Sequence, residues 1–244
     1  MKKAASTISI TTLVTPAEKW QSRNESATIV IDVLRATTSI VVALCQGAGA
    51  VYPVASIPAA RKLARSLPGF PLLAGERNGL RIPGFDLGNS PLEFQSSSIP
   101  RRPIVMCTTN GTKAIRRFGG DNKLYTAALV NMEATARLVS HQDGICLVCS
   151  GKEGKFSLED AFCAGGIISQ LKISRILHLD DGSLMCLAIW DAHRNDPLEL
   201  LRTCNHGIYL QSLGMTRDLE FCAQLNVYAK VPVWTGEKLV LDKQ

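Results

Sequence analysis

Three loops of similar composition carry the residues that could do chemistry in this 244-residue chain. Each loop follows a short apolar run and precedes a helical pattern. The loops contain Asp32, Arg35, Thr37 and Thr38; then Thr109, Asn110, Gly111, Thr112 and Lys113; then Ser150, Gly151, Glu159 and Asp160. Hydroxyls, glycines and cations before a helix suit phosphate, because helix N-termini expose free N–H groups and a partial positive charge. If the loops converge at strand ends, Arg35 and Lys113 are expected to clamp the phosphoryl oxygens.

Carboxylates in the same regions predict a metal ion. Asp32 and Glu76, with Glu159 or Asp160, are the candidate oxygen ligands of a hard divalent cation. A water activated by the metal would attack phosphorus. Acidic groups beside Arg35 favour an enzyme over a non-catalytic phosphometabolite-binding protein, because a pure binder of an anion gains nothing from like charge.

A long segment without clear periodicity, residues 75–99, adds further candidates. Ordered loops of this length are uncommon and often functional. Glu76 and Arg77 follow a short apolar run and could join the strand-end pocket, and Asn89 and Ser90 are predicted to contact the substrate. A second anionic group on the substrate would need a second cation, for which Arg77, Lys152 and Lys155 are candidates.

Each loop also has a purely structural interpretation. Ser, Thr, Asn and Asp before a helix commonly cap it, and the segment from Ser157 to Asp160 fits a capping box. Phosphatase chemistry at the Cys107 or Cys149 thiolate is disfavoured, because the basic residue six positions later is a lysine and not the bidentate arginine. An aspartyl-phosphate at Asp32 is disfavoured because Leu34 stands where a second carboxylate is expected. The patterns GxxxxGK[ST] and GxGxxG do not occur at these turns.

The elements that must position these residues alternate between strands and helices. Strands are expected at residues 27–31, 51–54, 72–74, 103–107, 124–127 and 145–149, with helices at 39–44, 56–67, 112–118, 131–141 and 157–172. Residues 180–224 look helical with breaks near Pro197 and Gly207, and 230–233 and 238–241 are short strand candidates. Alternation of this kind predicts a three-layer α/β/α fold with a largely parallel or mixed central sheet, in one domain over residues 1–244.

Composition and charge limit the classes of ligand and partner that this chain is expected to bind. The formal charge is +6 and the pI is about 8.9. The basic residues lie in small scattered groups without interleaved aromatics, so we expect no nucleic acid and a small anionic substrate instead. No run approaches the ~20 apolar residues of a membrane span. The eight cysteines lie mostly in apolar runs and read as reduced core thiols of a cytoplasmic protein. Apolar C-terminal segments such as VPVW leave room for a homodimer.

Five segments, in order along most of the chain, resemble the ComB family, the 2-phosphosulfolactate phosphatases. They are IDVLRATTSI, AGERNGLRIPGFDLGNSPLEF, TTNGTKAI, SGKEGKFSLEDAFCAGGII and DLEFCAQLNVYAKVPVW. The resemblance implies an α/β/α fold and Mg-dependent hydrolysis of a phosphate ester on a three-carbon sulfonated acid, whose product feeds coenzyme M synthesis in some methanogens. The segment 180–214 resembles the family less, and Asn205-His206-Gly207 matches it only in part. Another phosphorylated hydroxy acid therefore remains an alternative substrate.

Overall fold

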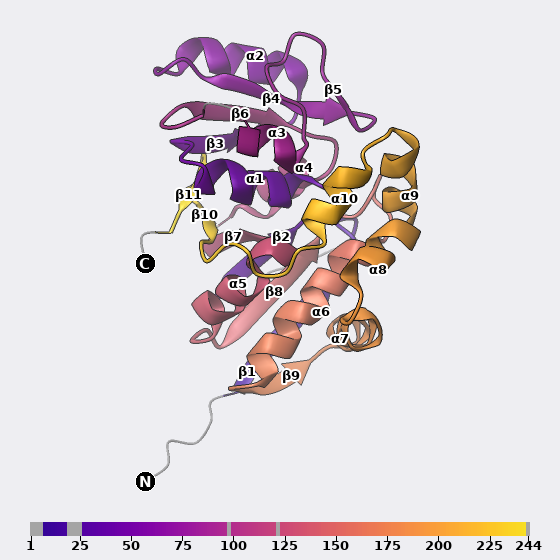
Figure 1. Ribbon diagram of the computed structural model, residues 1–244. Helices are drawn as coiled ribbons and strands as arrows, with labels where there is room; N and C mark the ends of the chain where they lie inside the picture. Colours follow the sequence, from indigo (N-terminus) through magenta and orange to yellow (C-terminus); the bar gives the residue numbers. More distant parts are fainter. Residues whose placement is uncertain (1–6, 19–25, 97–98, 121–122, 243–244) are drawn as a thin grey trace.

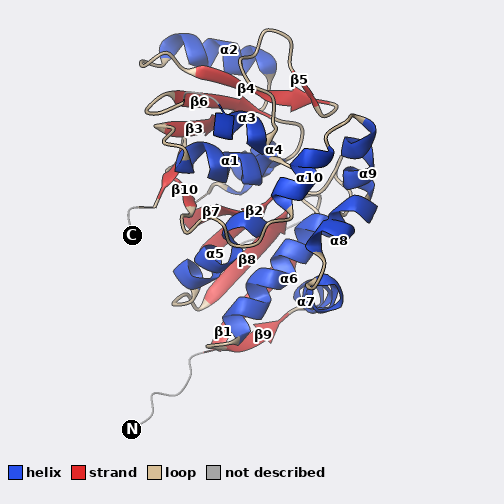
Figure 2. Cartoon of the chain, in the orientation of Figure 1, coloured by secondary structure: helices blue, strands red, loops and turns tan. Residues whose placement is uncertain are grey.

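Short apolar runs form the strands of a mixed sheet in the computed structural model, which describes residues 7–18, 26–96, 99–120 and 123–242 (Figures 1 and 2). The strands are β1 (Thr7–Leu13), β2 (Ala27–Ile31), β3 (Ala50–Pro53), β4 (Leu72–Arg77), β5 (Leu80–Arg81), β6 (Pro103–Cys107), β7 (Lys123–Ala127), β8 (Gly144–Cys149), β9 (Ile176–Leu179), β10 (Pro232–Trp234) and β11 (Leu239–Leu241). The helices are α1 (Ala36–Cys45), α2 (Ile57–Ser66), α3 (Pro91–Ser96), α4 (Gly111–Phe118), α5 (Met132–Val139) after a short 3₁₀ turn η1 (Leu129–Asn131), α6 (Leu158–Lys172), α7 (Asp181–His193), α8 (Pro197–Thr203), α9 (Asn205–Ser212) and α10 (Thr216–Cys222).

The sheet consists of two parallel groups joined by an antiparallel hairpin. Its order is β5-β4-β6-β3-β11-β10-β7-β2-β8-β1-β9. Strands β4, β6 and β3 are parallel to one another, as are β7, β2, β8, β1 and β9. The C-terminal hairpin β10–β11 lies between the groups and pairs with each through one registered residue pair, Val233 with Tyr125 and Leu239 with Val51.

Helices cover the strands on both faces, which confirms the predicted three-layer α/β/α arrangement. Along β2, Ile29 and Ile31 pack into a core with α5, α6 and α7, whereas Val30 packs on the opposite side with α1 and α4. This alternation follows from the two-residue period of a strand. Helix α2 covers the other face of β3 and β6.

Helix α1 lies at the centre of the molecule. Nine of its ten residues are buried, and it contacts strands of both parallel groups as well as the hairpin. A helix that is apolar around its whole circumference is a buried one, which explains the sequence ATTSIVVALC. The residues just before α1 are thereby held at the junction of the two groups, and the site is built there.

The strands and helices expected from the sequence are present, with differences in three places. Strands β1 and β9 were missed, although Ile8 and Ile10 alternate with the exposed Thr7 and Ser9. The segment 75–99, expected to be a loop, contains the end of β4, the short strand β5 and helix α3. The helix break that was expected near Gly207 falls at Cys204, between α8 and α9, and Gly207 lies inside α9. The segment VPVW runs into β10 and pairs within the chain's own sheet, and the homodimer stays a prediction. No helix in the described parts of the chain is long and apolar enough to cross a bilayer.

Candidate active site

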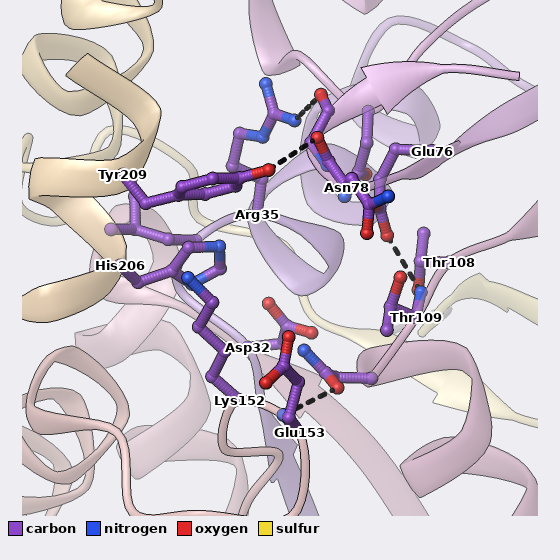
Figure 3. Close-up of a pocket in the computed structure, with 14 residues that line it drawn as sticks. Asp32, Arg35, Glu76, Asn78, Thr108, Thr109, Lys152, Glu153, His206 and Tyr209 are labelled. Atoms are coloured by element: carbon purple, nitrogen blue, oxygen red, sulfur yellow. Dashed lines mark hydrogen bonds between the residues drawn. The ribbon is translucent and has the colours of Figure 1, made fainter. Parts of the chain in front are cut away.

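A cavity of about 160 Å³ opens where the strand ends of both parallel groups meet α9. Figure 3 shows Asp32 in its middle, with His206 and Tyr209 on one wall and Glu76 and Thr109 on the opposite one. The lining residues are Asp32, Leu34, Arg35, Glu76, Asn78, Gly79, Asn89, Thr108, Thr109, Asn110, Lys152, Glu153, His206 and Tyr209. The strand-end location of this site is therefore the one that the sequence predicts for an open α/β sheet.

Asp32 is held in place by the first turn of α1. Its Oδ1 accepts a hydrogen bond from the backbone N–H of Ala36 at 3.1 Å, and its backbone exchanges two bonds of 2.8 Å with the hydroxyl of Thr37. Gly111 approaches from α4 so closely that a Cβ there would lie 2.5 Å from Asp32 Oδ2. The position of the carboxylate is thus fixed by a helix start and by a glycine that leaves it room.

Burial raises the pKa of Asp32 to about 6. The charges of Glu76 and Glu159 act in the same direction, while the charge of His206 and the bond from Ala36 oppose them. Burial also disfavours ionisation of Glu159, but the hydrogen bond and charge of His206 outweigh it and hold the pKa of Glu159 below its usual range. His206 Nδ1 lies 3.2 Å from Glu159 Oε1, so the histidine is oriented by this carboxylate.

Glu76 ties the second parallel group to the site. It is buried at the end of β4, where Oε1 accepts from the N–H of Thr109 at 2.8 Å and Oε2 from the N–H of Gly79 at 3.0 Å. These two bonds fix the turn after β4 against the loop after β6. Asp32 and Glu76 therefore face one cavity from strands of different groups.

The cations of the cavity are Arg35, Lys152 and, when protonated, His206. Arg35 is buried and follows a cis peptide bond from Leu34. Lys152, which comes from the loop after β8, places its Nζ 4.1 Å from the centre of the Tyr209 ring, a cation–π contact.

Seven of the predicted site residues line the cavity: Asp32, Arg35, Glu76, Asn89, Thr109, Asn110 and Lys152. Several others stabilise the loops around it instead. The hydroxyl of Thr37 bonds to Asp32 and that of Thr38 to the carbonyl of Val33, while Thr112 bonds to Thr108 and Ser90 to Asp218. Arg77 donates to the carbonyl of Glu76 and to Cys107. The carboxylate of Asp160 accepts from the N–H groups of Val33 and Gly151, so it joins two loops, and Asp160 does not line the cavity.

Four further predicted residues, Lys113, Ser150, Gly151 and Glu159, do not line the cavity. Lys113 is exposed and lines a neighbouring depression together with Ser150 and Arg117. Glu159 lies behind His206 and lines another depression. Gly151 has a positive φ of 63°, and a Cβ there would collide with the carbonyl of Lys155. The roles assigned to these residues stay predictions.

Sequence reasoning gave no role to His206 or Tyr209. They lie three residues apart on α9, a spacing that places both on one helix face. That spacing was readable, but α9 is about 170 residues from Asp32 along the chain, and only packing brings it to the cavity.

The donors of the cavity fit Mg²⁺. Among the described residues, no group of three or more His, Cys, Asp and Glu side chains converges on one point. Mg²⁺ needs only one or two carboxylates together with other oxygens and water. Asp32 and Glu76 supply the carboxylates, and the buried Oδ1 of Asn89, which has no hydrogen-bond partner within the described residues, supplies a neutral oxygen.

Comparisons with known proteins identify the family of this chain. The model of the family described as 2-phosphosulpholactate phosphatase matches residues 13–237. A probable 2-phosphosulfolactate phosphatase of Symbiobacterium thermophilum is 40% identical over 231 residues, which cover 93% of this chain and 98% of the relative. Relatives with the same name from Carboxydothermus hydrogenoformans and Deinococcus radiodurans are each 41% identical, over 88% and 84% of this chain and 89% and 85% of their own lengths. The likeness thus runs through all the elements that build the cavity, and the chain belongs to the 2-phosphosulfolactate phosphatase family.

Proposed function

We propose that this protein hydrolyses the phosphate monoester of 2-phosphosulfolactate, giving sulfolactate and inorganic phosphate. The observation that carries the proposal is the cavity that is lined by the buried residues Asp32, Glu76 and Arg35, two carboxylates and a guanidinium. The substrate is inferred from family membership, because the relatives are named as probable 2-phosphosulfolactate phosphatases.

Each part of the cavity has a task in this reaction. Arg35 binds phosphoryl oxygens, and the N–H and hydroxyl groups of the loop from Thr108 to Asn110 are placed to donate further bonds. Lys152, a second cation of the cavity lining, is assigned to a second anionic group of the substrate. His206 lines the same cavity, and its Nδ1 is held by Glu159. The other ring nitrogen is then the proton donor for the leaving oxygen when the ring is protonated.

Asp32, Glu76 and Asn89 are the residues we assign to Mg²⁺. When bound, the metal supplies positive charge for the phosphoryl oxygens and lowers the pKa of a coordinated water. The protein's own contribution is to fix the two carboxylates, that of Asp32 through the bond from Ala36 and that of Glu76 through the bonds from Thr109 and Gly79.

The test is phosphate release from 2-phosphosulfolactate with Mg²⁺ and after its removal by a chelator. We expect turnover that depends on the metal and a loss of at least ~100-fold in Asp32→Ala, because the variant lacks an anionic ligand at the reacting centre. A folded Asp32→Ala protein with full activity would refute the site. Phosphate release is also measured with a panel of other phosphorylated hydroxy acids, and faster release from one of them would identify a different substrate. Binding of these compounds without any phosphate release would identify a non-catalytic binding protein.

A further inference from the structure

Asp218, on α10, has a carboxylate that is almost completely buried and fully engaged. Its Oδ2 lies 2.6 Å from Arg35 Nη1, and its Oδ1 accepts a hydrogen bond of 2.6 Å from the hydroxyl of Ser90. The side chains of Arg35 and Asp218 are only 3% and 6% exposed. Asp218 does not line the cavity itself, so any effect it has on the reaction must pass through Arg35.

We propose that Asp218 is a positioning residue, which fixes the guanidinium of Arg35 in the orientation that receives the phosphoryl group. This inference rests on the proposed function, because it assumes that Arg35 binds phosphate. It assigns a role to the segment DLEF, which lies far from the strand-end loops in the sequence.

The hydrogen bonds of Arg35 define that orientation. Nη1 donates to Asp218 and to Met215 Sδ at 2.9 Å, and Nη2 donates to the carbonyl of Gly79 at 2.7 Å. A guanidinium has five N–H groups. The remaining two, at Nε and Nη2, have no protein partner within the described residues, and Arg35 lines the cavity. Two N–H groups of one planar fork are what bidentate binding of a phosphate requires.

The second oxygen of Asp218 prevents the pair from turning. Ser90 lies just before α3, and α10 packs against α3. The bond from Ser90 therefore anchors the carboxylate to an element other than the one that carries it. Arg35, Ser90 and Asp218 come from three distant parts of the chain, and the bonds among them fix the guanidinium.

Because Arg35 and Asp218 carry opposite charges, the direction in which Asp218→Asn changes phosphate affinity tests the proposal. Asp218 cancels the charge of Arg35, so Asp218→Asn makes this side of the cavity more positive. If charge alone governed phosphate binding, the variant would bind an anion more tightly. If Asp218 acts by positioning, the variant binds it more weakly, because an amide cannot replace the charge-assisted bond that holds the guanidinium.

The experiment compares Asp218→Asn, Arg35→Ala and the double variant with the wild-type protein. Binding of inorganic phosphate is measured by calorimetry, and kcat and KM are measured with 2-phosphosulfolactate. We expect Asp218→Asn to lower phosphate affinity and kcat/KM by roughly 10- to 100-fold, the loss of one charge-assisted hydrogen bond. In the Arg35→Ala background the same change should cost less than about 3-fold.

Glu220→Gln is the matched control. Glu220 lies on the same helix and forms an ion pair of 3.6 Å with Arg202 at the surface, away from the cavity. This variant should keep the wild-type phosphate affinity and kcat/KM. Circular dichroism and thermal unfolding confirm that each variant is folded.

If Asp218→Asn does not fold, Ser90→Ala takes its place. This variant removes the hydrogen bond from Ser90 to Asp218 and leaves the charges of Arg35 and Asp218 unchanged. A several-fold loss of phosphate affinity that disappears in the Arg35→Ala background supports the proposal. Wild-type or tighter phosphate binding by Asp218→Asn, or an equal loss with and without Arg35, overturns it. A wild-type protein that binds phosphate but hydrolyses no ester refutes the proposed function alone, since the phosphate measurements still decide on Asp218.

Discussion

Asp32 shows, at the scale of one residue, how a functional carboxylate is kept in an environment that lowers the stability of the fold. Its carboxylate is buried beside Glu76 and Glu159, and burial is the main reason that its pKa rises from 3.8 to about 6. A perturbed carboxyl in a cavity is typical of catalytic sites. The surrounding helix start and the glycine at 111 hold it there despite the unfavourable environment.

This shift predicts how stability depends on pH in the metal-free protein. Since the folded-state pKa of Asp32 exceeds the unfolded value, the folded state binds more protons between about pH 4 and pH 6. The contribution of Asp32 to the free energy of unfolding therefore falls as the pH rises through this window. Asp32→Asn should remove that contribution and be more stable than the wild type by about 3 kcal/mol at pH 7, while losing activity.

Urea unfolding at pH 4 and pH 7 in the presence of a chelator measures the difference. The two proteins should have similar stability at pH 4 and diverge towards pH 7. A variant that is equally stable or less stable at pH 7 would contradict the interpretation of Asp32 as a buried and strained charge.

At the scale of an element, α9 decides which side chains form one wall of the cavity. The helix follows α8 with only Cys204 between them, and its Gly207 lies so close to α8 that a Cβ would collide with the carbonyl of Leu201. The close approach of the two helices turns His206 and Tyr209 towards the site. The hydroxyl of Tyr209 then donates to the carbonyl of Asn78 at 3.0 Å, across the cavity mouth (Figure 3).

Gly207→Ala should therefore move α9 away from α8 and disturb the site. We expect a loss of stability of about 1–3 kcal/mol from overpacking and a fall in kcat/KM of at least ~10-fold. Thermal unfolding and phosphate-release kinetics measure the two effects. Gly120→Ala serves as the control, because none of the residues that the structure describes lies within 4 Å of the added methyl group. Equal behaviour of the two variants would mean that the contact of α8 with α9 does not position the cavity wall.

At the scale of the whole molecule, the C-terminal hairpin joins two parallel groups that both contribute to the cavity. Asp32 and Lys152 follow β2 and β8 of one group, whereas Glu76 and Thr109 belong to β4 and the loop after β6 of the other. The hairpin pairs with each group through a single registered residue pair. Its packing, with Leu239 fully buried against the central core, must therefore hold the groups in place.

Leu239→Ala tests this arrangement. The cavity left by the lost side chain should cost about 2–5 kcal/mol of stability. Activity should fall with it at a temperature where the variant remains folded, because the carboxylates of the two groups lose their fixed separation. Leu184→Ala, at a position that is 51% exposed on α7, is the control and should change stability by no more than about 0.5 kcal/mol. Full activity of a folded but destabilised Leu239→Ala protein would show that the groups are held together by other contacts.

The sequence by itself determined most of the strands and helices, the strand-end loops, two of the carboxylates and the arginine of the cavity, and the family, which the comparisons confirm. Strand and helix periods, caps and glycine turns depend on residues within a few positions of each other, so they can be read locally. The tertiary structure decided which of the predicted polar side chains face the cavity. The hydroxyl of Thr37 and the carboxylate of Asp160 are engaged by backbone groups, whereas Asn89 presents an unpartnered oxygen. It also brought His206, Tyr209 and Asp218 from the C-terminal helices to the loop after β2. Contacts over such sequence separations depend on how whole helices pack, and no local pattern specifies that packing.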